Sequence, residues 1–168
     1  PVLHLILFAD DTNIFMSHRD LPTLVRMLNV ELKLLSSWFR ANKLSLNVDK
    51  THFIIFRGVR KRCSSDTPDK LVIEVQPINQ VRTTKFLGVY IDEHLTWEAH
   101  VDNVKMKVSN TCGIINKVNH KLPRSILLQI YNCLLLPYLQ YCAMIWVCNV
   151  SNQSKLTSLL TIQKRAIR

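Results

Sequence analysis

The sequence lacks the cysteine arrangements that define disulfide-rich and zinc-binding proteins. It has five cysteines, an odd number, and none of them forms a Cys-x-x-Cys pair. An odd count argues against the disulfide framework of a small secreted protein. Its six histidines are scattered along the chain, so no group of cysteines and histidines has the spacing of a zinc site. These absences predict an intracellular protein without structural zinc.

Signal peptides, internal repeats and low-complexity tracts are also missing. The apolar start has no basic leading segment and runs into two aspartates, unlike a secretory signal. One uncharged run, residues 126–148, has about the length that spans a bilayer. Pro137 would interrupt such a helix midway. We therefore expect two buried helices of a packed domain here and no membrane, with a spanning helix as the alternative.

Acidic residues are scarce relative to basic ones. Lysine and arginine total 22 against 12 aspartates and glutamates, which gives a formal net charge of +10. An excess of this size suggests a polyanionic partner, and nucleic acid is the simplest one. At 168 residues with 48% apolar and 20% charged residues, the chain is otherwise ordinary for a globular protein of one domain or two small ones.

Basic residues gather in two places. Between residues 40 and 62 the only acidic residue is Asp49, so we predict that this segment follows phosphates. A solvated loop that touches nothing is the alternative. Its densest part holds Arg57, Arg60, Lys61 and Arg62. A second, thinner set lies along and after a predicted helix, where a duplex backbone could lie: Lys105, Lys107, Lys117, Lys121 and Arg124.

The first half of the chain shows strand patterns around one helical pattern. Apolar runs at residues 2–8 and 12–16, joined by a short polar junction, predict a β-hairpin. Apolar residues recur at helical spacing over residues 21–39, which predicts an amphipathic helix capped by Asp20, with Trp38 in the core. Residues 52–56 and 71–75 predict a second hairpin around a polar loop. Residues 85–91 predict one further strand.

The second half is helical by the same criterion. Apolar residues from Val101 to Val118 form one stripe, and we expect His100 to cap or pack this helix. Pro123 is placed to open a helix over residues 122–135, Pro137 opens a third, and residues 156–167 mark a fourth. The whole pattern predicts an α+β fold in which antiparallel strands with a packed helix precede an all-helical bundle.

Two adjacent carboxylates, Asp10 and Asp11, lie at the bend of the first hairpin. Placing both there is costly unless a cation binds them, and a divalent metal is the leading candidate. Neighbouring strand side chains point to opposite faces, so we assign Asp10 as the metal ligand and Asp11 as its helper. The alternative is that Asp-Asp is simply a favourable turn dipeptide.

The order of several motifs points to one family. Phe8, Ala9, Asp10 and Asp11 resemble the polymerase box of reverse transcriptases, and later blocks resemble those of the non-LTR, LINE-type retrotransposon enzymes. Each block is weak alone, but the ordered series covers nearly the whole chain. The blocks are Trp38 with residues 42–47, Lys50 and Thr51; residues 85–92; residues 95–97 with His100; and Leu122, Pro123, Ile130, Tyr131, Pro137, Tyr141, Cys142 and Trp146 with residues 163–168.

This resemblance implies the C-terminal part of a polymerase palm at residues 1–94 and a helical, thumb-like domain at residues 95–168. It implies RNA-directed DNA synthesis on an RNA template and a DNA primer, from deoxynucleoside triphosphates. Two Mg²⁺ ions would carry the nucleotidyl transfer. Asp10 and Asp11 would be their ligands here. A nuclear or cytoplasmic ribonucleoprotein location follows, while the oligomeric state stays open.

The resemblance also suggests roles for single residues. Phe8, where many relatives have tyrosine, would present its ring near the primer end beside Ala9. Phe86, Leu87 and Gly88 correspond to the primer grip, although Gly88 could equally be a glycine that only bends the strand. Lys50 would contact phosphate or serve a structural role, with general acid as its alternative catalytic role.

The resembled enzymes carry fingers and another metal-binding aspartate upstream of this box, and the sequence as given starts at Pro1. We therefore expect the isolated chain to be inactive. Two alternatives remain open. The chain could be a nucleic-acid-binding module without chemistry, or a degenerate remnant of an element that binds nothing.

Overall fold

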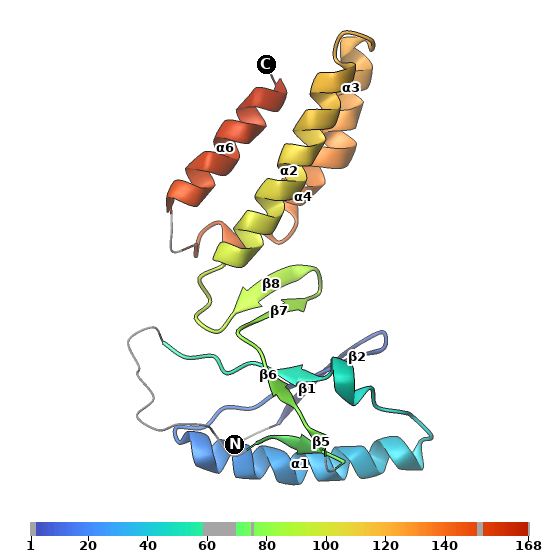
Figure 1. Ribbon diagram of the computed structural model, residues 1–168, viewed down its shortest axis with the longest axis vertical. Helices are drawn as coiled ribbons and strands as arrows, with labels where there is room; N and C mark the ends of the chain where they lie inside the picture. Colours follow the sequence, from blue (N-terminus) through green and yellow to red (C-terminus); the bar gives the residue numbers. More distant parts are fainter. Residues whose placement is uncertain (1–2, 59–69, 75, 151–152, 168) are drawn as a thin grey trace. The chain divides into compact units, whose positions relative to one another are not determined.

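A computed structural model describes residues 3–58, 70–74, 76–150 and 153–167 (Figure 1). The chain divides into an N-terminal unit, Pro1–Phe53 with Val59–Val81, and a C-terminal unit, Ile54–Gly58 with Arg82–Arg168. The N-terminal unit holds β1 (His4–Phe8), β2 (Asp11–Phe15), α1 (Leu21–Ala41), η1 (Val48–Lys50), β3 (His52–Phe53), β4 (Val72–Ile73), β5 (Gln76–Pro77) and β6 (Asn79–Gln80). The C-terminal unit holds β7 (Thr83–Phe86), β8 (Val89–Asp92), α2 (Glu98–Val118), α3 (Arg124–Ile130), η2 (Tyr131–Leu135), α4 (Leu136–Gln140), α5 (Ala143–Trp146) and α6 (Gln153–Ile167). The mixture of short, mostly antiparallel strands and helices confirms the predicted α+β composition.

The first hairpin forms as predicted. Strands β1 and β2 pair antiparallel from His4 opposite Phe15 to Phe8 opposite Asp11, which leaves Ala9 and Asp10 as a two-residue loop. Ala9 adopts a positive φ of 52°. A positive φ at the first loop position characterises the mirror-image turns that match the twist of a hairpin.

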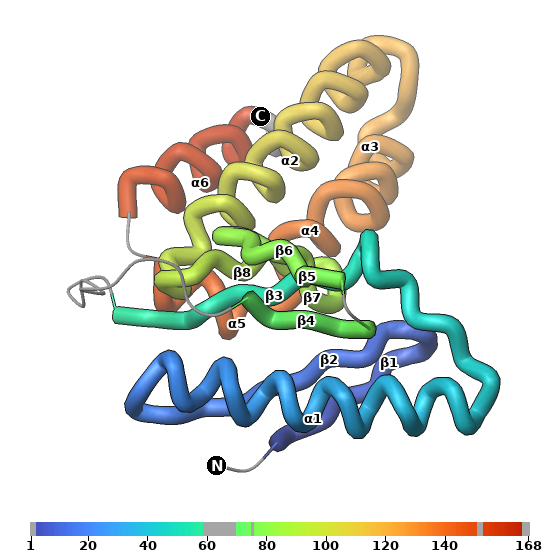
Figure 2. The backbone as a smooth tube through the Cα atoms, turned by 60° about the horizontal axis from the view of Figure 1, so that its bottom comes forward, coloured from blue at the N-terminus to red at the C-terminus, as the bar shows by residue number. Residues whose placement is uncertain are grey.

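Helix α1 is amphipathic and confirms the predicted stripe. Its buried residues, Val25, Leu32 and Ser36, lie on one face, and Ser36 turns its hydroxyl back to the carbonyl of Leu32 at 2.8 Å. Figure 2 shows the β1–β2 hairpin beside this helix, and Ile14 of β2 packs at the edge of the cluster. The cluster is completed by Ile73 of β4, by Leu71 directly before that strand and by Ile78 between β5 and β6.

Asp20 caps this helix as predicted, since its carboxylate accepts the backbone N–H of Thr23 at 3.0 Å. Hydrogen bonds from the Thr23 side chain and backbone hold the pKa of Asp20 below its ordinary value of 3.8. The cap is therefore complete above about pH 4 and weakens as the pH falls further. Pro22 lies in the first turn, where it removes no helical hydrogen bond.

Asp20→Ala is expected to lower the urea midpoint of the N-terminal unit and to speed hydrogen exchange at the Thr23 amide, because that amide loses its acceptor. Asp20→Asn is the matched control, since asparagine caps about as well as aspartate without the charge. Equal Thr23 exchange in the alanine variant and the wild type would contradict this role for Asp20.

Trp38 does not lie in the core, so that prediction is wrong. Its side chain is 54% exposed on α1, in edge contact with Phe39. Trp38 follows Leu32 by about one and two-thirds turns, which places it away from the buried stripe.

The later strands of the N-terminal unit pair differently from the prediction of one hairpin. Strand β3 pairs in parallel with β6, and β4 pairs antiparallel with β5, across a turn in which Glu74 has a positive φ. The predicted pairing of residues 52–56 with residues 71–75 is therefore wrong. Closing the short turn after β4 costs less chain entropy than closing the long loop before it.

Residues 85–91 form two strands instead of the single predicted one. Phe86 of β7 pairs with Val89 of β8, so Leu87 and Gly88 are a two-residue turn with φ values of 46° and 86°. Positive φ at both positions is typical of a type I′ turn. Gly88 is thus a turn residue, and the interpretation as a strand glycine is wrong.

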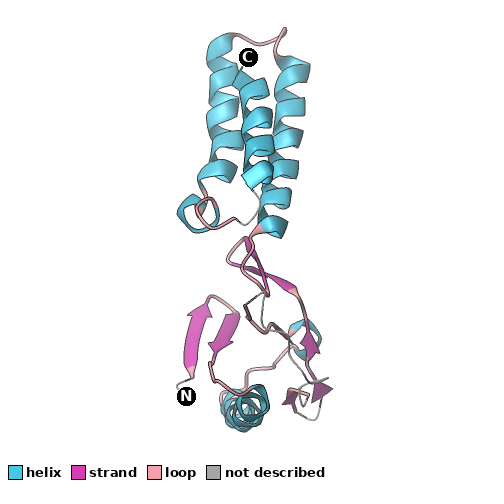
Figure 3. Ribbon diagram, turned by 90° about the vertical axis from the view of Figure 1, so that its left-hand side faces the viewer, coloured by secondary structure: helices cyan, strands magenta, loops and turns pink. Residues whose placement is uncertain are grey.

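The core of the C-terminal unit lies along α2. The predicted stripe is confirmed, because Val101, Val104, Val108, Cys112 and Ile115 are all buried. Figure 3 shows the long helices of this unit running side by side. Facing α2, the cluster is filled by Val89, Leu135, Trp146 and Leu159.

A nearly continuous helical stretch runs through α3, η2 and α4. Pro123 precedes α3 and Pro137 lies in the first turn of α4, as the two prolines predicted. Proline clashes with the carbonyl of the preceding turn, and the wider π-type turn η2 lies where that clash would fall. Among the described residues no helix is both long and apolar enough to cross a bilayer.

Candidate functional site

The two aspartates lie at the tip of the first hairpin. Asp10 is the second loop residue, whereas Asp11 is the first residue of β2, directly opposite Phe8. Both side chains are exposed, as is Phe8. Directly opposite residues share one face of a hairpin, so the Phe8 ring and the Asp11 carboxylate emerge on the same side. The two carboxylates therefore differ in position, but the turn separates them and not the alternation of strand side chains on which the prediction rested.

The chemistry of these donors suits a hard cation. Carboxylate oxygens are preferred by Mg²⁺, which keeps several waters when only one or two carboxylates bind it. Across the ranges that the structure describes, no group of three or more histidine, cysteine, aspartate or glutamate side chains could hold a metal ion. Asp10 and Asp11 fit magnesium in kind, but they supply only part of a binding site.

The strand before the aspartates exposes its apolar side chains. Leu5, Ile6, Leu7 and Phe8 are each more than two-fifths exposed, although a half-buried strand would hide every second one. Among the described residues β1 pairs only with β2. An exposed apolar strand of this kind is a template for further pairing or for aggregation.

Lys50 ends the short η1 turn, which Asn47 caps by accepting the Lys50 backbone N–H at 3.2 Å. Its side chain is exposed, so its amino group can reach phosphate without a burial cost. This geometry leaves both the phosphate contact and the general-acid role of Lys50 as predictions.

Arg57 is engaged by another side chain. Its guanidinium pairs with the Glu93 carboxylate at 2.9 Å, and the backbone carbonyl of Arg57 lies 3.1 Å from Nδ1 of His94. A phosphate bound at Arg57 would compete with that ion pair. The other predicted contacts of this segment, Arg60, Lys61 and Arg62, lie outside the described residues.

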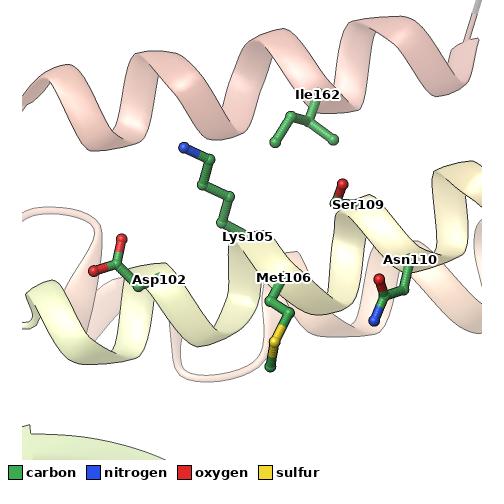
Figure 4. A pocket seen from close by; sticks show the side chains of 6 residues that line it. All are labelled: Asp102, Lys105, Met106, Ser109, Asn110 and Ile162. Atoms are coloured by element: carbon green, nitrogen blue, oxygen red, sulfur yellow. The ribbon is translucent and has the colours of Figure 1, made fainter.

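Lys105 borders a shallow hollow of about 320 Å³ between α2 and α6. In Figure 4 its amino group extends from α2 toward the helix that carries Ile162. The lining has charges of both signs, because Asp102 also borders it. Asp102 in turn binds Lys155 at 2.7 Å. The hollow is too open and mixed in charge to select a small ligand, so a phosphate contact at Lys105 stays a prediction.

The predicted primer-grip residues lie at the β7–β8 turn. Leu87 is exposed and Phe86 is half-buried. The Tyr141 hydroxyl donates a hydrogen bond to the Leu87 carbonyl at 2.6 Å. The sequence placed Tyr141 in a motif block without a role, and no local signal could have revealed this contact.

His100 lies in the first turn of α2, where it caps nothing, and it packs against Trp146 of α5, a partner that the sequence did not indicate. It is buried, its ring lies edge-on to Trp146 with centroids 5.3 Å apart, and its Nδ1 accepts the Tyr90 backbone N–H at 3.3 Å. Burial lowers the pKa of His100, and the nearby charge of Lys107 lowers it further. His100 is therefore a neutral structural residue near pH 7.

Two curated proteins are similar to most of the chain. One, from Drosophila melanogaster, is named a probable RNA-directed DNA polymerase from transposon X-element and is 28% identical over 137 residues. The other, from Nasonia vitripennis, is named a retrovirus-related Pol polyprotein from type-1 retrotransposable element R1 2 and is 24% identical over 145 residues. The alignments cover 79% and 83% of this chain but 14% and 35% of those proteins.

No protein-family model and no solved structure matches the chain. The two relatives nevertheless confirm the resemblance to reverse transcriptases of non-LTR retrotransposons, which the ordered motifs had indicated. This chain spans a small part of the one relative and about a third of the other.

Proposed function

We propose that this chain is a fragment of an RNA-directed DNA polymerase of a non-LTR retrotransposon, with part of the palm in residues 1–94 and a thumb-like domain in residues 95–168. The observation that carries this proposal is the pair of exposed carboxylates, Asp10 and Asp11, at the tip of a hairpin with a two-residue loop. The names of the two relatives support it. Its setting would be a nuclear or cytoplasmic ribonucleoprotein.

The intact enzyme would join deoxynucleoside triphosphates to a DNA primer on an RNA template. Asp10, helped by Asp11, would hold two Mg²⁺ ions together with an aspartate from elsewhere in the protein. When bound, magnesium lowers the pKa of the primer hydroxyl and neutralises charge on the phosphates. The short hairpin loop fixes where Asp10 emerges, because β1 and β2 pair up to the residues on either side of it.

Other residues of the chain would bind and orient the nucleic acid. The exposed Phe8 ring would lie against the primer end beside Ala9, and Phe86, Leu87 and Gly88 would hold the primer strand. Lys50, Lys105 and the basic segment with Arg57, Arg60, Lys61 and Arg62 would contact phosphates. These contacts would position the substrate, whereas the carboxylates would hold the metal ions at the reacting atoms.

Primer extension tests the proposal. The 168-residue chain with a DNA-primed RNA template, deoxynucleoside triphosphates and Mg²⁺ is expected to make no product, because two carboxylates hold the metal incompletely. A longer polypeptide that adds the in-frame upstream coding sequence is expected to extend the primer, and Asp10→Ala is expected to remove that activity. Asp10-dependent synthesis by the short chain would refute its inactivity, and synthesis insensitive to Asp10→Ala would refute the metal role.

A non-catalytic nucleic-acid-binding module is the second candidate, and the formal net charge of +10 favours it. It predicts duplex binding that weakens steeply with salt, does not require Mg²⁺ and is unchanged by Asp10→Ala. Fluorescence anisotropy between about 50 and 200 mM salt measures all three properties. A degenerate remnant would differ from both candidates, since it would show no binding and no cooperative unfolding transition.

A further inference from the structure

The β7–β8 hairpin is held by the helical part of its own unit at two points. At the turn, the Tyr141 hydroxyl donates to the carbonyl of Leu87 at 2.6 Å. On the outer edge of β8, Nδ1 of His100 accepts the Tyr90 N–H at 3.3 Å. Tyr90 is opposite Lys85, and in an antiparallel ladder with this register its N–H points away from β7. The hairpin is therefore fixed in two directions.

Trp146 connects these two points. It is 1% exposed, its Nε1 donates to the carbonyl of Tyr141 at 2.9 Å, and its ring contacts that of His100 edge-on. The backbone N–H of Tyr141 is bonded in turn to the carbonyl of Pro137 at 2.9 Å. The backbone of Tyr141 is thus held by two hydrogen bonds, one to α4 and one to the buried Trp146. Its side chain makes the contact with the β7–β8 turn.

The Tyr141 ring covers Gly88. A β-carbon built on Gly88 would lie 3.4 Å from Cε1 of Tyr141, and Gly88 has a φ of 86° that favours glycine. The ring thus lies beside the turn at the distance where a β-carbon would just make ordinary van der Waals contact, and the positive φ is what favours glycine here. The Tyr141 hydroxyl donates to the carbonyl of Leu87, while the ring lies beside Gly88.

This joint lies at the surface. Tyr141 is 51% exposed and Leu87 is 39% exposed, so the hydroxyl and the carbonyl could each bond to water instead. Exposed hydrogen bonds add little to stability because water replaces them readily. The buried core of the unit is built from other residues, among them Val101, Val108 and Leu135. The bond from Tyr141 thus orients a surface turn without being needed to hold the fold together.

We infer that Tyr141 is a positioning residue that orients the Leu87–Gly88 turn toward the terminus of the primer strand. This inference rests on the proposed function, in which that turn contacts the primer. Without the hydroxyl, β7 and β8 keep their pairing, but the Leu87 carbonyl loses the hydrogen bond that fixes its direction. The turn residues that would contact the primer end then vary more in position. Tyr141 itself acts through the turn and not on the reacting atoms.

The experiment compares two hybrids of equal length, one with a recessed primer end and one blunt, by fluorescence anisotropy with the 168-residue chain. The wild type is expected to prefer the recessed hybrid. Tyr141→Phe is expected to reduce that preference by at most about fivefold, the upper bound set by one hydrogen bond that acts through the turn, with unchanged affinity for the blunt hybrid. Tyr138→Phe is the matched control, because Lys107 contacts the Tyr138 ring and that contact survives loss of the hydroxyl.

A second measurement reports on the turn itself. The ¹⁵N chemical shift of the Gly88 amide responds to hydrogen bonding at the adjoining Leu87 carbonyl, so it should change in Tyr141→Phe and not in Tyr138→Phe. An unchanged Gly88 shift overturns the inference, as does a changed shift with the recessed-end preference intact. If the wild type itself shows no preference, the primer contact in the proposed function fails and the inference falls with it, and the Gly88 shift then shows whether the hydrogen bond exists.

Discussion

Replacing Trp146 with alanine is expected to lower the free energy of unfolding of the C-terminal unit by about 3–5 kcal/mol. The side chain is 1% exposed within the core that lines α2, so its removal leaves a large cavity. The variant also loses the donor to the Tyr141 carbonyl and the edge contact with His100.

Urea denaturation followed by far-ultraviolet circular dichroism measures this loss. Trp38→Ala is the matched control, because Trp38 is an exposed tryptophan on a helix, and its truncation is expected to cost less than about 1 kcal/mol. If the two variants were equally destabilised, the assignment of Trp146 to the core would be wrong. If both were as stable as the wild type, the core would lie elsewhere.

Asp92→Ala is expected to lower the free energy of unfolding of the same unit by about 2–4 kcal/mol, the range for losing several bonds to a charged acceptor. The carboxylate at the end of β8 accepts the backbone N–H groups of His94, Thr96 and Trp97 and the Thr96 hydroxyl, at 2.9–3.1 Å. These bonds fold the loop into the start of α2, where Trp97 has a positive φ and caps nothing with its own side chain. Without them, the donors of that loop lose their common acceptor.

The same carboxylate makes stability depend on pH. Burial alone would raise the pKa of Asp92, but the hydrogen bonds from Thr96, Trp97 and His94 together outweigh it and hold the pKa below the ordinary value of 3.8. A lowered pKa in the folded state means that the stabilisation is complete above about pH 4 and is lost as the pH falls below it. Asp92→Asn is expected to flatten this acid limb of the stability curve.

Asp102→Ala is the control for Asp92→Ala. Asp102 lies on α2 and is mostly exposed, and its ion pair with Lys155 is of the surface kind that contributes less than about 1 kcal/mol. Urea midpoints of the wild type and the three aspartate variants are measured from about pH 2 to about pH 7, a range that covers the acid transition and the plateau above it. An acid limb in Asp92→Asn as steep as that of the wild type would show that another group causes it.

The features that the sequence predicted well depend on neighbours within a few residues. The stripe on α1, its cap at Asp20 and the stripe on α2 follow from helical spacing and cap chemistry. The first hairpin follows from two apolar runs around a polar junction, and this placed Asp10 at its tip. The position of the candidate carboxylates therefore follows from the local sequence pattern.

The predictions that failed concern which strands pair, where a turn without polar residues lies, and which face of a helix is buried. Residues 85–91 contain no polar turn dipeptide, so an apolar run that reverses at Leu87 and Gly88 resembles one straight strand. The partner of β3 lies across a long loop, and strand composition does not specify which of several short strands will pair. Trp38 is apolar but lies off the buried stripe. The prediction failed because the hydrophobicity of one residue does not tell which face of a helix is covered.

By itself the amino-acid sequence determined the long helices α1 and α2, the first hairpin, the basic charge and the order of the motifs, since each depends on local spacing or on composition. Tertiary structure alone decided that Trp146 lies between His100 and Tyr141, and that Tyr141 reaches a turn 54 residues earlier in the chain. Such contacts depend on how helices and strands pack after they form, because a side chain finds a distant partner only when a shared core brings both elements together.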